Sequence, residues 1–224
     1  MRYLQALRNT ILLILATCVL AGVSSSAGAM NVAAGWQLDF KPGPLRLFKD
    51  PDSGQSYWYM TYVVTNTTGQ DLRWAPSMEL FYDDGRIMLA GRGVPGSVTK
   101  QLLKMLGNPL LQDQNQILGE LLQGKEHAKE GLAVWVADTN TEGSSHYHSF
   151  DDGRVTWNSK VIPVTELSFF LTGASSQTEK VRNPITRKEV VLRKTLRRDF
   201  IVPGNYQERG SEPVTVVSDT WIMR

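Results

Sequence analysis

The chain has 224 residues, of which 42% are hydrophobic and 21% charged, so it is long enough to bury one sizeable apolar core. Its 24 basic and 22 acidic residues leave a formal charge of only +2, which argues against binding to a nucleic-acid backbone as the main function. The single cysteine, Cys18, excludes an intramolecular disulfide.

The first 29 residues have the order of an export signal. Arg2 and Arg8 precede an apolar run from Ile11 to Val23, and the small residues 27–29 follow it. Thirteen apolar positions span about 20 Å as a helix, which is short of the roughly 30 Å of a bilayer core. We therefore expect cleavage after residue 29, which removes Cys18 and leaves residues 30–224 as a formally neutral domain in the periplasm or extracellular space.

Two alternatives remain for this segment. The signal could be retained, or Cys18 could carry a lipid, because residues 15–18 resemble a lipoprotein box; Thr17 is a poor residue for that box. After Met30 no apolar run is long enough to span a membrane, so we do not expect an integral membrane protein once the signal is removed.

Strand patterns dominate residues 30–224. The clearest runs from Tyr57 to Asn66, where aromatic and β-branched side chains occupy both faces, so we expect a central strand that is covered on both sides. Other strand patterns predict strands at 36–48, 72–74, 78–82, 86–90, 132–137, 161–171, 189–202 and 214–223.

The hydrophobic period changes between residues 97 and 123. Ser97 is a suitable cap for a helix that ends at Gly107. Asn108 and Pro109 are suitable for the start of a second helix, which ends at Gly124. The sequence therefore predicts one domain, an immunoglobulin-like antiparallel β-sandwich with a two-helix insertion at about 97–123.

Two resemblances agree with this prediction. The run YWYMTYVVTNTTGQDL, residues 57–72, resembles the strand–turn–strand of secreted bacterial immunoglobulin-like modules. Together with VVLRKTLRRDFIVPG, residues 190–204, and the terminal TWIMR, it is similar to an exported family of planctomycete-type bacteria. The first resemblance implies an immunoglobulin-like strand arrangement. The second implies no particular activity and transfers no functional residue.

A candidate metal site lies in the polar stretch after the predicted strand at 132–137. His146 and His148 are two positions apart, so in an extended segment both imidazoles point the same way, and Asp151 follows as a third candidate ligand. The alternative is a solvated loop, since glycine and serine precede the histidines and Gly153 follows them.

A second candidate site is the basic segment 180–198, in which Glu189 is the only acidic residue. This local charge could bind an anionic polymer or surface of the cell envelope. The alternative is a solvated hairpin whose charge is balanced by acidic turns elsewhere. The candidate polyanion-binding residues are Arg187, Lys188, Arg193, Lys194, Arg197 and Arg198.

Three further patterns have simpler interpretations. Residues 91–96 match G-x-G-x-x-G, but no parallel strand follows the predicted helix, so we expect a flexible lead into the helical insertion rather than a nucleotide site. Tyr57, Trp58 and Tyr59 could stack on a sugar, although core packing is favoured on so apolar a strand. Asn66 begins a glycosylation sequon, to which a bacterial-type signal gives little weight.

The sequence therefore favours an exported binding or structural protein without catalytic activity, whose partner is an envelope protein or polysaccharide. It predicts no cofactor and no nucleic-acid partner. The alternative function is a metal-dependent or glycan-acting hydrolase that uses the loop 146–152.

Overall fold

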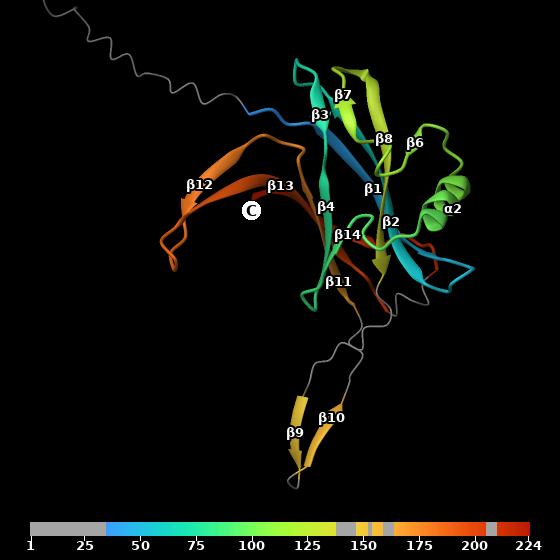
Figure 1. Cartoon of the computed structure of the whole chain (residues 1–224), viewed down its shortest axis with the longest axis vertical. Coiled ribbons are helices and arrows are strands. Elements are labelled where there is room, and N and C mark those ends of the chain that lie inside the picture. The colour runs from blue at the N-terminus through green and yellow to red at the C-terminus, as the bar shows by residue number, and fades with distance from the viewer. Residues whose placement is uncertain (1–34, 138–146, 152–153, 159–163, 205–209) are drawn as a thin grey trace, which may run out of the picture. The chain divides into compact units, whose positions relative to one another are not determined.

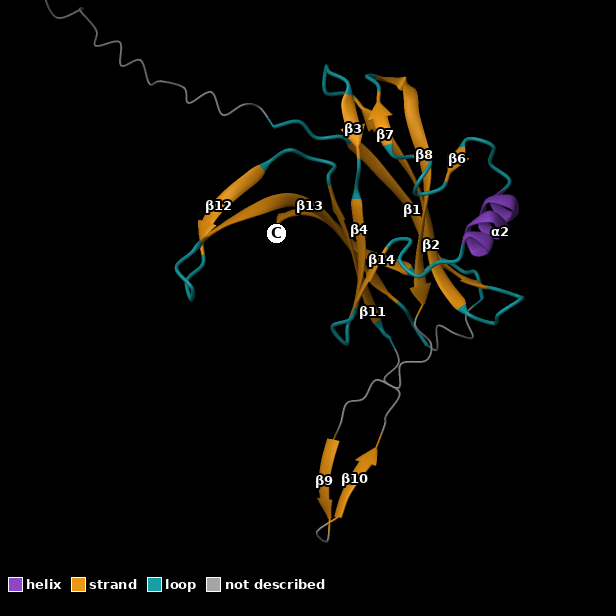
Figure 2. Ribbon diagram, viewed as in Figure 1, coloured by secondary structure: helices purple, strands orange, loops and turns teal. Residues whose placement is uncertain are grey.

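The computed structural model describes residues 35–137, 147–151, 154–158, 164–204 and 210–224. Strands make up most of these residues, and the described part of the chain contains one helix (Figure 2). The predicted signal segment and its cleavage site lie outside the described residues. No helix in the described part is long and apolar enough to cross a membrane.

The first sheet has the order β1-β2-β8-β6, and its pairs are antiparallel except for β6 with β8. Its strands are β1 (Asp39–Lys49), β2 (Ser56–Asn66), β8 (Gly124–Ala137) and β6 (Leu111–Gln112). β2 is hydrogen-bonded on both edges, and nine of its eleven residues are buried. The prediction that residues 57–66 form a central strand covered on both faces is therefore confirmed.

The second sheet has the order β12-β13-β11-β4-β5, and β14 also pairs with β13. Its strands are β12 (Thr178–Arg182), β13 (Glu189–Ile201), β11 (Glu166–Thr172), β4 (Ser77–Tyr82), β5 (Ile87–Leu89) and β14 (Thr215–Met223). All of these pairs are antiparallel. The described residues also form two small antiparallel pairs: β3 (Leu72–Trp74) with β7 (Gly119–Leu121), and β9 (Tyr147–Asp151) with β10 (Arg154–Asn158).

The two large sheets face each other across one apolar core (Figure 1). Phe169 of β11 contacts the first sheet at two points: its ring lies edge-on to Trp135 at 5.9 Å and stacked with Phe40 at 6.4 Å. Trp58, Trp74 and Trp135 are fully buried. Large aromatic rings between opposed sheets are the packing of a β-sandwich, so the mainly antiparallel β class predicted from the sequence is confirmed.

The helix α2 (Gly96–Leu106) covers the outer face of the first sheet. It buries Val98 and Leu102 in a second apolar cluster with Tyr57 and Tyr59. Gly107 ends the helix in the left-handed region at φ 63°, as predicted, and its N–H donates to the carbonyl of Leu103. The predicted cap was misplaced: Pro95 is the N-cap, and Ser97 lies inside the first turn.

The second predicted helix, over residues 108–123, was wrong. This segment contains β6, a turn and β7, and its backbone hydrogen bonds go to β8 and β3. Asn108 does act as a cap, but for a local turn in which its Oδ1 accepts from the N–H of Leu110 at 3.0 Å. Gly119 then takes φ 117°, which breaks helical geometry. The apolar side chains of this segment do not share one face: Leu110, Leu118 and Leu122 are exposed, whereas Leu111, Ile117 and Leu121 are buried.

Candidate functional site

Only part of the predicted metal site lies within the described residues. His146 lies outside the described residues, and the structure gives only the backbone pairing of His148 and Asp151, which face Trp157 and Arg154 across the β9–β10 hairpin. Among the described residues no group of three potential metal ligands comes together. The metal site at His146, His148 and Asp151 therefore stays a prediction.

The basic segment divides into two parts, and the part nearer the C-terminus of β13 is tied into the body of the sandwich. The Nη2 of Arg198 lies 2.5 Å from Asp219 on β14, and its Nη1 donates to the carbonyl of Pro42 on β1 at 3.2 Å. Arg198 thus connects the two sheets. Lys194 donates to Gln177 at 2.9 Å and lies over the Trp221 ring.

Arg197 belongs to the same fixed part, because it is paired with Asp199 at 2.8 Å. Burial by itself would raise the pKa of Asp199, but hydrogen bonds from Ser168, Arg197 and Ser218 outweigh it and hold that pKa below its usual value. This carboxylate is satisfied by three partners in its own sheet, and Arg197 is tied to it through its Nε.

The rest of the basic segment, together with the two residues before it, makes up residues 178–193, which we call the arm. It consists of β12, a turn and the first residues of β13, and β12 is hydrogen-bonded to no other described strand than β13. In Figure 1 the arm curves away from the core. Within the described residues, the side chains of Arg187, Lys188 and Arg193 form no ion pair.

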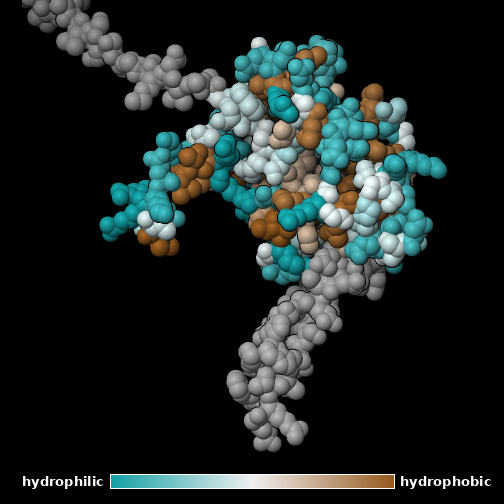
Figure 3. Space-filling model, viewed as in Figure 1, coloured by the Kyte–Doolittle hydropathy of each residue, from teal (hydrophilic) through white to brown (hydrophobic). Residues whose placement is uncertain are grey.

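The tip of the arm is an ordered turn built on Asn183. Its Oδ1 accepts from the N–H groups of Ile185 and Thr186, both at 2.9 Å, and its carbonyl accepts from Arg187. The turn leaves Ile185 90% exposed beside the two cations that follow. Exposed apolar side chains continue along β13 among hydrophilic ones, and Figure 3 shows this mixture on the arm.

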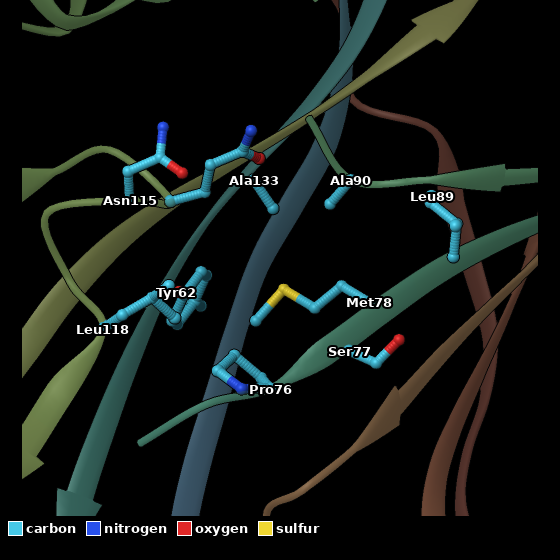
Figure 4. Close-up of a pocket in the computed structure, with 10 residues that line it drawn as sticks. Tyr62, Pro76, Ser77, Met78, Leu89, Ala90, Asn115, Leu118 and Ala133 are labelled. Carbon is cyan, nitrogen blue, oxygen red and sulfur yellow. The ribbon is translucent and has the colours of Figure 1, made fainter. Parts of the chain in front are cut away.

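A separate cleft of about 310 Å³ opens between the sheets (Figure 4). Tyr62 of β2 and Ala133 of β8 line one wall, Met78 of β4 and Ala90 line the other, and the loop 113–118 borders it. In Figure 4 the Met78 side chain extends between these walls, and Leu118 lies on the loop side, beside Tyr62.

The position of the Tyr62 ring in the cleft depends on a glycine in the neighbouring strand. Its strand partner is Gly131, and a Cβ at that position would overlap the Tyr62 ring and approach Ile117 to 2.6 Å. The ring therefore packs directly over the β8 backbone, close to Phe40 and Trp74. Burial raises the pKa of Tyr62 to about 12. Tyr62 is consequently a neutral hydroxyl at any physiological pH.

Three other sequence patterns can be placed. Tyr57, Trp58 and Tyr59 are at most 4% exposed and belong to the core, as favoured. Residues 91–95 lie between β5 and α2, and Gly96 is the first residue of α2. The Asn66 side chain is fully buried and its amide nitrogen donates to two carbonyls, so this sequon is inaccessible in the folded domain.

The cleft was missed by the sequence reasoning because its residues come from five separate segments. The signal in the sequence was Gly131, which separates the polar first half of β8 from its apolar second half and lies opposite an aromatic residue. Comparisons with protein-family models, curated proteins and solved structures found no significant match to this chain.

Proposed function

We propose that this chain is an exported, non-catalytic binding protein with an immunoglobulin-like β-sandwich, which attaches to anionic polymers of the cell envelope through the arm. Export and the extracytoplasmic compartment are supported by the charged, apolar and small-residue order of residues 1–29. The immunoglobulin-like arrangement is supported by the strand–turn–strand run at 57–72. Membership of the chain in a planctomycete-type exported family is supported by the same run together with residues 190–204 and the terminal TWIMR.

The observation that carries the proposal is the difference between the two parts of the basic segment. Arg197 and Arg198 are held by carboxylates of their own sheet. The arm carries five cations against two carboxylates, and of these only Lys180 and Glu189 pair with each other, at 2.9 Å. A projecting hairpin with uncompensated positive charge attracts an anionic polymer and leaves the core undisturbed.

The test is retention on a dextran sulfate resin at increasing salt. The arm variant replaces Arg182, Arg187, Lys188 and Arg193 with glutamine. At about 0.5 kcal/mol for each exposed cation, the four changes weaken binding roughly 30-fold. Because the contacts are exposed, retention of the unmodified protein must also decline as salt rises.

A matched control removes the same charge elsewhere. Arg73, Arg92, Lys100 and Lys104 are exposed and lie outside the arm, and their replacement with glutamine leaves retention close to that of the unmodified protein. Equal loss in the two variants would show that only net charge matters and would contradict the proposal. Retention that does not weaken with salt would contradict it as well.

A further inference from the structure

The two faces of the arm differ in character. Directly opposite residues of an antiparallel pair lie on the same face of the ribbon, so the register of β12 with β13 assigns each side chain to a face. Three of the four side chains on one face are apolar, namely Val181, Val190 and Leu192. The other face carries three of the arm's five cations, namely Lys180, Arg182 and Arg193. The arm is therefore an amphipathic ribbon.

The ribbon is only two strands wide over most of its length. β14 reaches as far as Arg193, whose N–H donates to the carbonyl of Arg224 at 2.7 Å, and residues 189–192 pair with β12 alone among the described strands. Val190 is 39% and Val191 49% exposed. A two-stranded ribbon is at best marginally stable in water by itself. The arm is consequently stabilised by a surface that covers its apolar side chains.

The tip of the arm presents an apolar side chain on a backbone without free donors. Pro184 has no N–H group. The N–H groups of Ile185 and Thr186 donate to the Asn183 side chain, and the next N–H, of Arg187, donates to its carbonyl at 2.8 Å. An unsatisfied N–H is costly in apolar surroundings. This turn therefore carries its 90% exposed isoleucine into such surroundings without that cost, and Figure 3 shows hydrophobic atoms at the end of the arm.

The charges beside the tip determine which apolar surroundings fit. Arg187 and Lys188 follow the tip directly, are exposed, and form no ion pair with the described residues. Anionic lipid headgroups attract such cations, and an inserted apolar side chain adds to the attraction. A soluble polyanion engages the cations but leaves Ile185 in water. The combination therefore favours a lipid surface.

We propose that the arm docks on the surface of an anionic lipid layer. Ile185 enters the boundary between headgroups and acyl chains, and Arg187 and Lys188 contact the anionic headgroups. This inference rests on the proposed function, because the same free cations supply the attraction. It adds an apolar contact, by which the arm distinguishes a lipid surface from a soluble polymer.

The test uses an environment-sensitive fluorophore at the tip of the full chain. Ile185→Cys in a Cys18→Ser background gives one labelling site. We expect vesicles of equal parts phosphatidylglycerol and phosphatidylcholine to raise the emission, and spin-labelled lipids to quench it. Phosphatidylcholine vesicles and dextran sulfate leave the emission unchanged. When the four arm cations are replaced with glutamine, the same emission requires at least about a hundredfold more lipid, since each cation near the surface contributes roughly fivefold.

The matched control carries the label on another exposed apolar residue. Leu110 is 68% exposed and lies outside the arm, so the label in Leu110→Cys/Cys18→Ser keeps its emission on anionic vesicles. An equal rise at both positions would overturn the proposal, because insertion would then not be specific to the tip.

The remaining outcomes separate this inference from the proposed function. Retention on dextran sulfate without a change at position 185 on anionic vesicles would overturn the lipid contact alone. Loss of both readouts would overturn the proposed function as well. A rise caused by dextran sulfate without lipid would show that a polymer covers the tip, and a rise with protein concentration in the absence of vesicles would show that a second copy covers it. Either result would overturn the lipid contact.

Discussion

Replacing Asn66 with alanine removes a fully buried amide that makes four hydrogen bonds. Its Nδ2 donates to the carbonyls of Gln70 and Leu121, both at 2.8 Å, and its Oδ1 accepts from the N–H and the hydroxyl of Thr68, at 3.1 and 2.7 Å. Gln70 and Thr68 are near the surface and can re-pair with water, whereas the bond to Leu121 is buried. Leaving the Leu121 carbonyl buried without a donor costs about 1–3 kcal/mol, and losing the hydrogen bonds of the turn costs about 1 kcal/mol. We therefore expect the free energy of unfolding to fall by about 2–4 kcal/mol.

The assay is urea unfolding followed by tryptophan fluorescence, because Trp74 is fully buried and ends the strand that follows the turn. Asn115→Ala is the control: its side chain is exposed and makes no hydrogen bond within the described residues, so the free energy of unfolding changes by less than about 0.5 kcal/mol. Asn66→Asp places a carboxylate against two carbonyls and is at least as destabilising as alanine. A loss below about 1 kcal/mol in Asn66→Ala would refute this account of the turn.

Four further outcomes are expected. Arg198→Gln breaks the connection between the sheets and lowers the free energy of unfolding by about 1–2 kcal/mol in urea titrations, with little effect of salt. The pKa of Asp199 is held below its usual 3.8 in the folded protein, so its contribution to stability is present above about pH 4 and is lost as pH falls further. In a series of unfolding curves at different pH, Asp199→Asn therefore reduces the loss of stability on the acid side. Amides of residues 58–64 exchange with deuterium only at the rate of global unfolding, because β2 is paired on both edges. If the predicted loop site binds a metal, elemental analysis of the purified protein finds it in stoichiometric amount and loses it in His146→Ala/His148→Ala; absence in both leaves the hydrolase alternative without support.

The elements that the sequence predicts well are those whose pattern depends on local geometry. Alternation on two apolar faces marks β2 whatever its neighbours are, and Gly107 ends α2 through its own backbone preference. Residues 108–123 carry an equally suggestive leucine pattern, yet their backbone bonds with β8 and β3. Those partners lie elsewhere in the sequence, so tertiary pairing overrides the helical signal.

The same distinction applies to the candidate sites. Composition alone identifies the basic segment 180–198. Which cations remain free depends on β13 pairing with β14, since this pairing brings Asp219 opposite Arg198, while Asp199 holds Arg197. The cleft depends still more on topology, because it needs β2, β8 and β4 to meet beside the loop 113–118. No spacing in the chain encodes that meeting.

The arm and the cleft lie on different strands, so the arm variant tests polymer binding without disturbing the core. They share no residue: the arm belongs to β12 and β13, whereas the cleft is lined by β2, β4, β8 and the loops beside them. Replacing four exposed arm cations with glutamine therefore lowers retention on dextran sulfate and changes the free energy of unfolding by less than about 0.5 kcal/mol for each residue. A larger loss of stability would show that the arm is coupled to the core through β11, which lies between β13 and β4 in the second sheet. Weaker retention would then not be the effect of the missing charges alone.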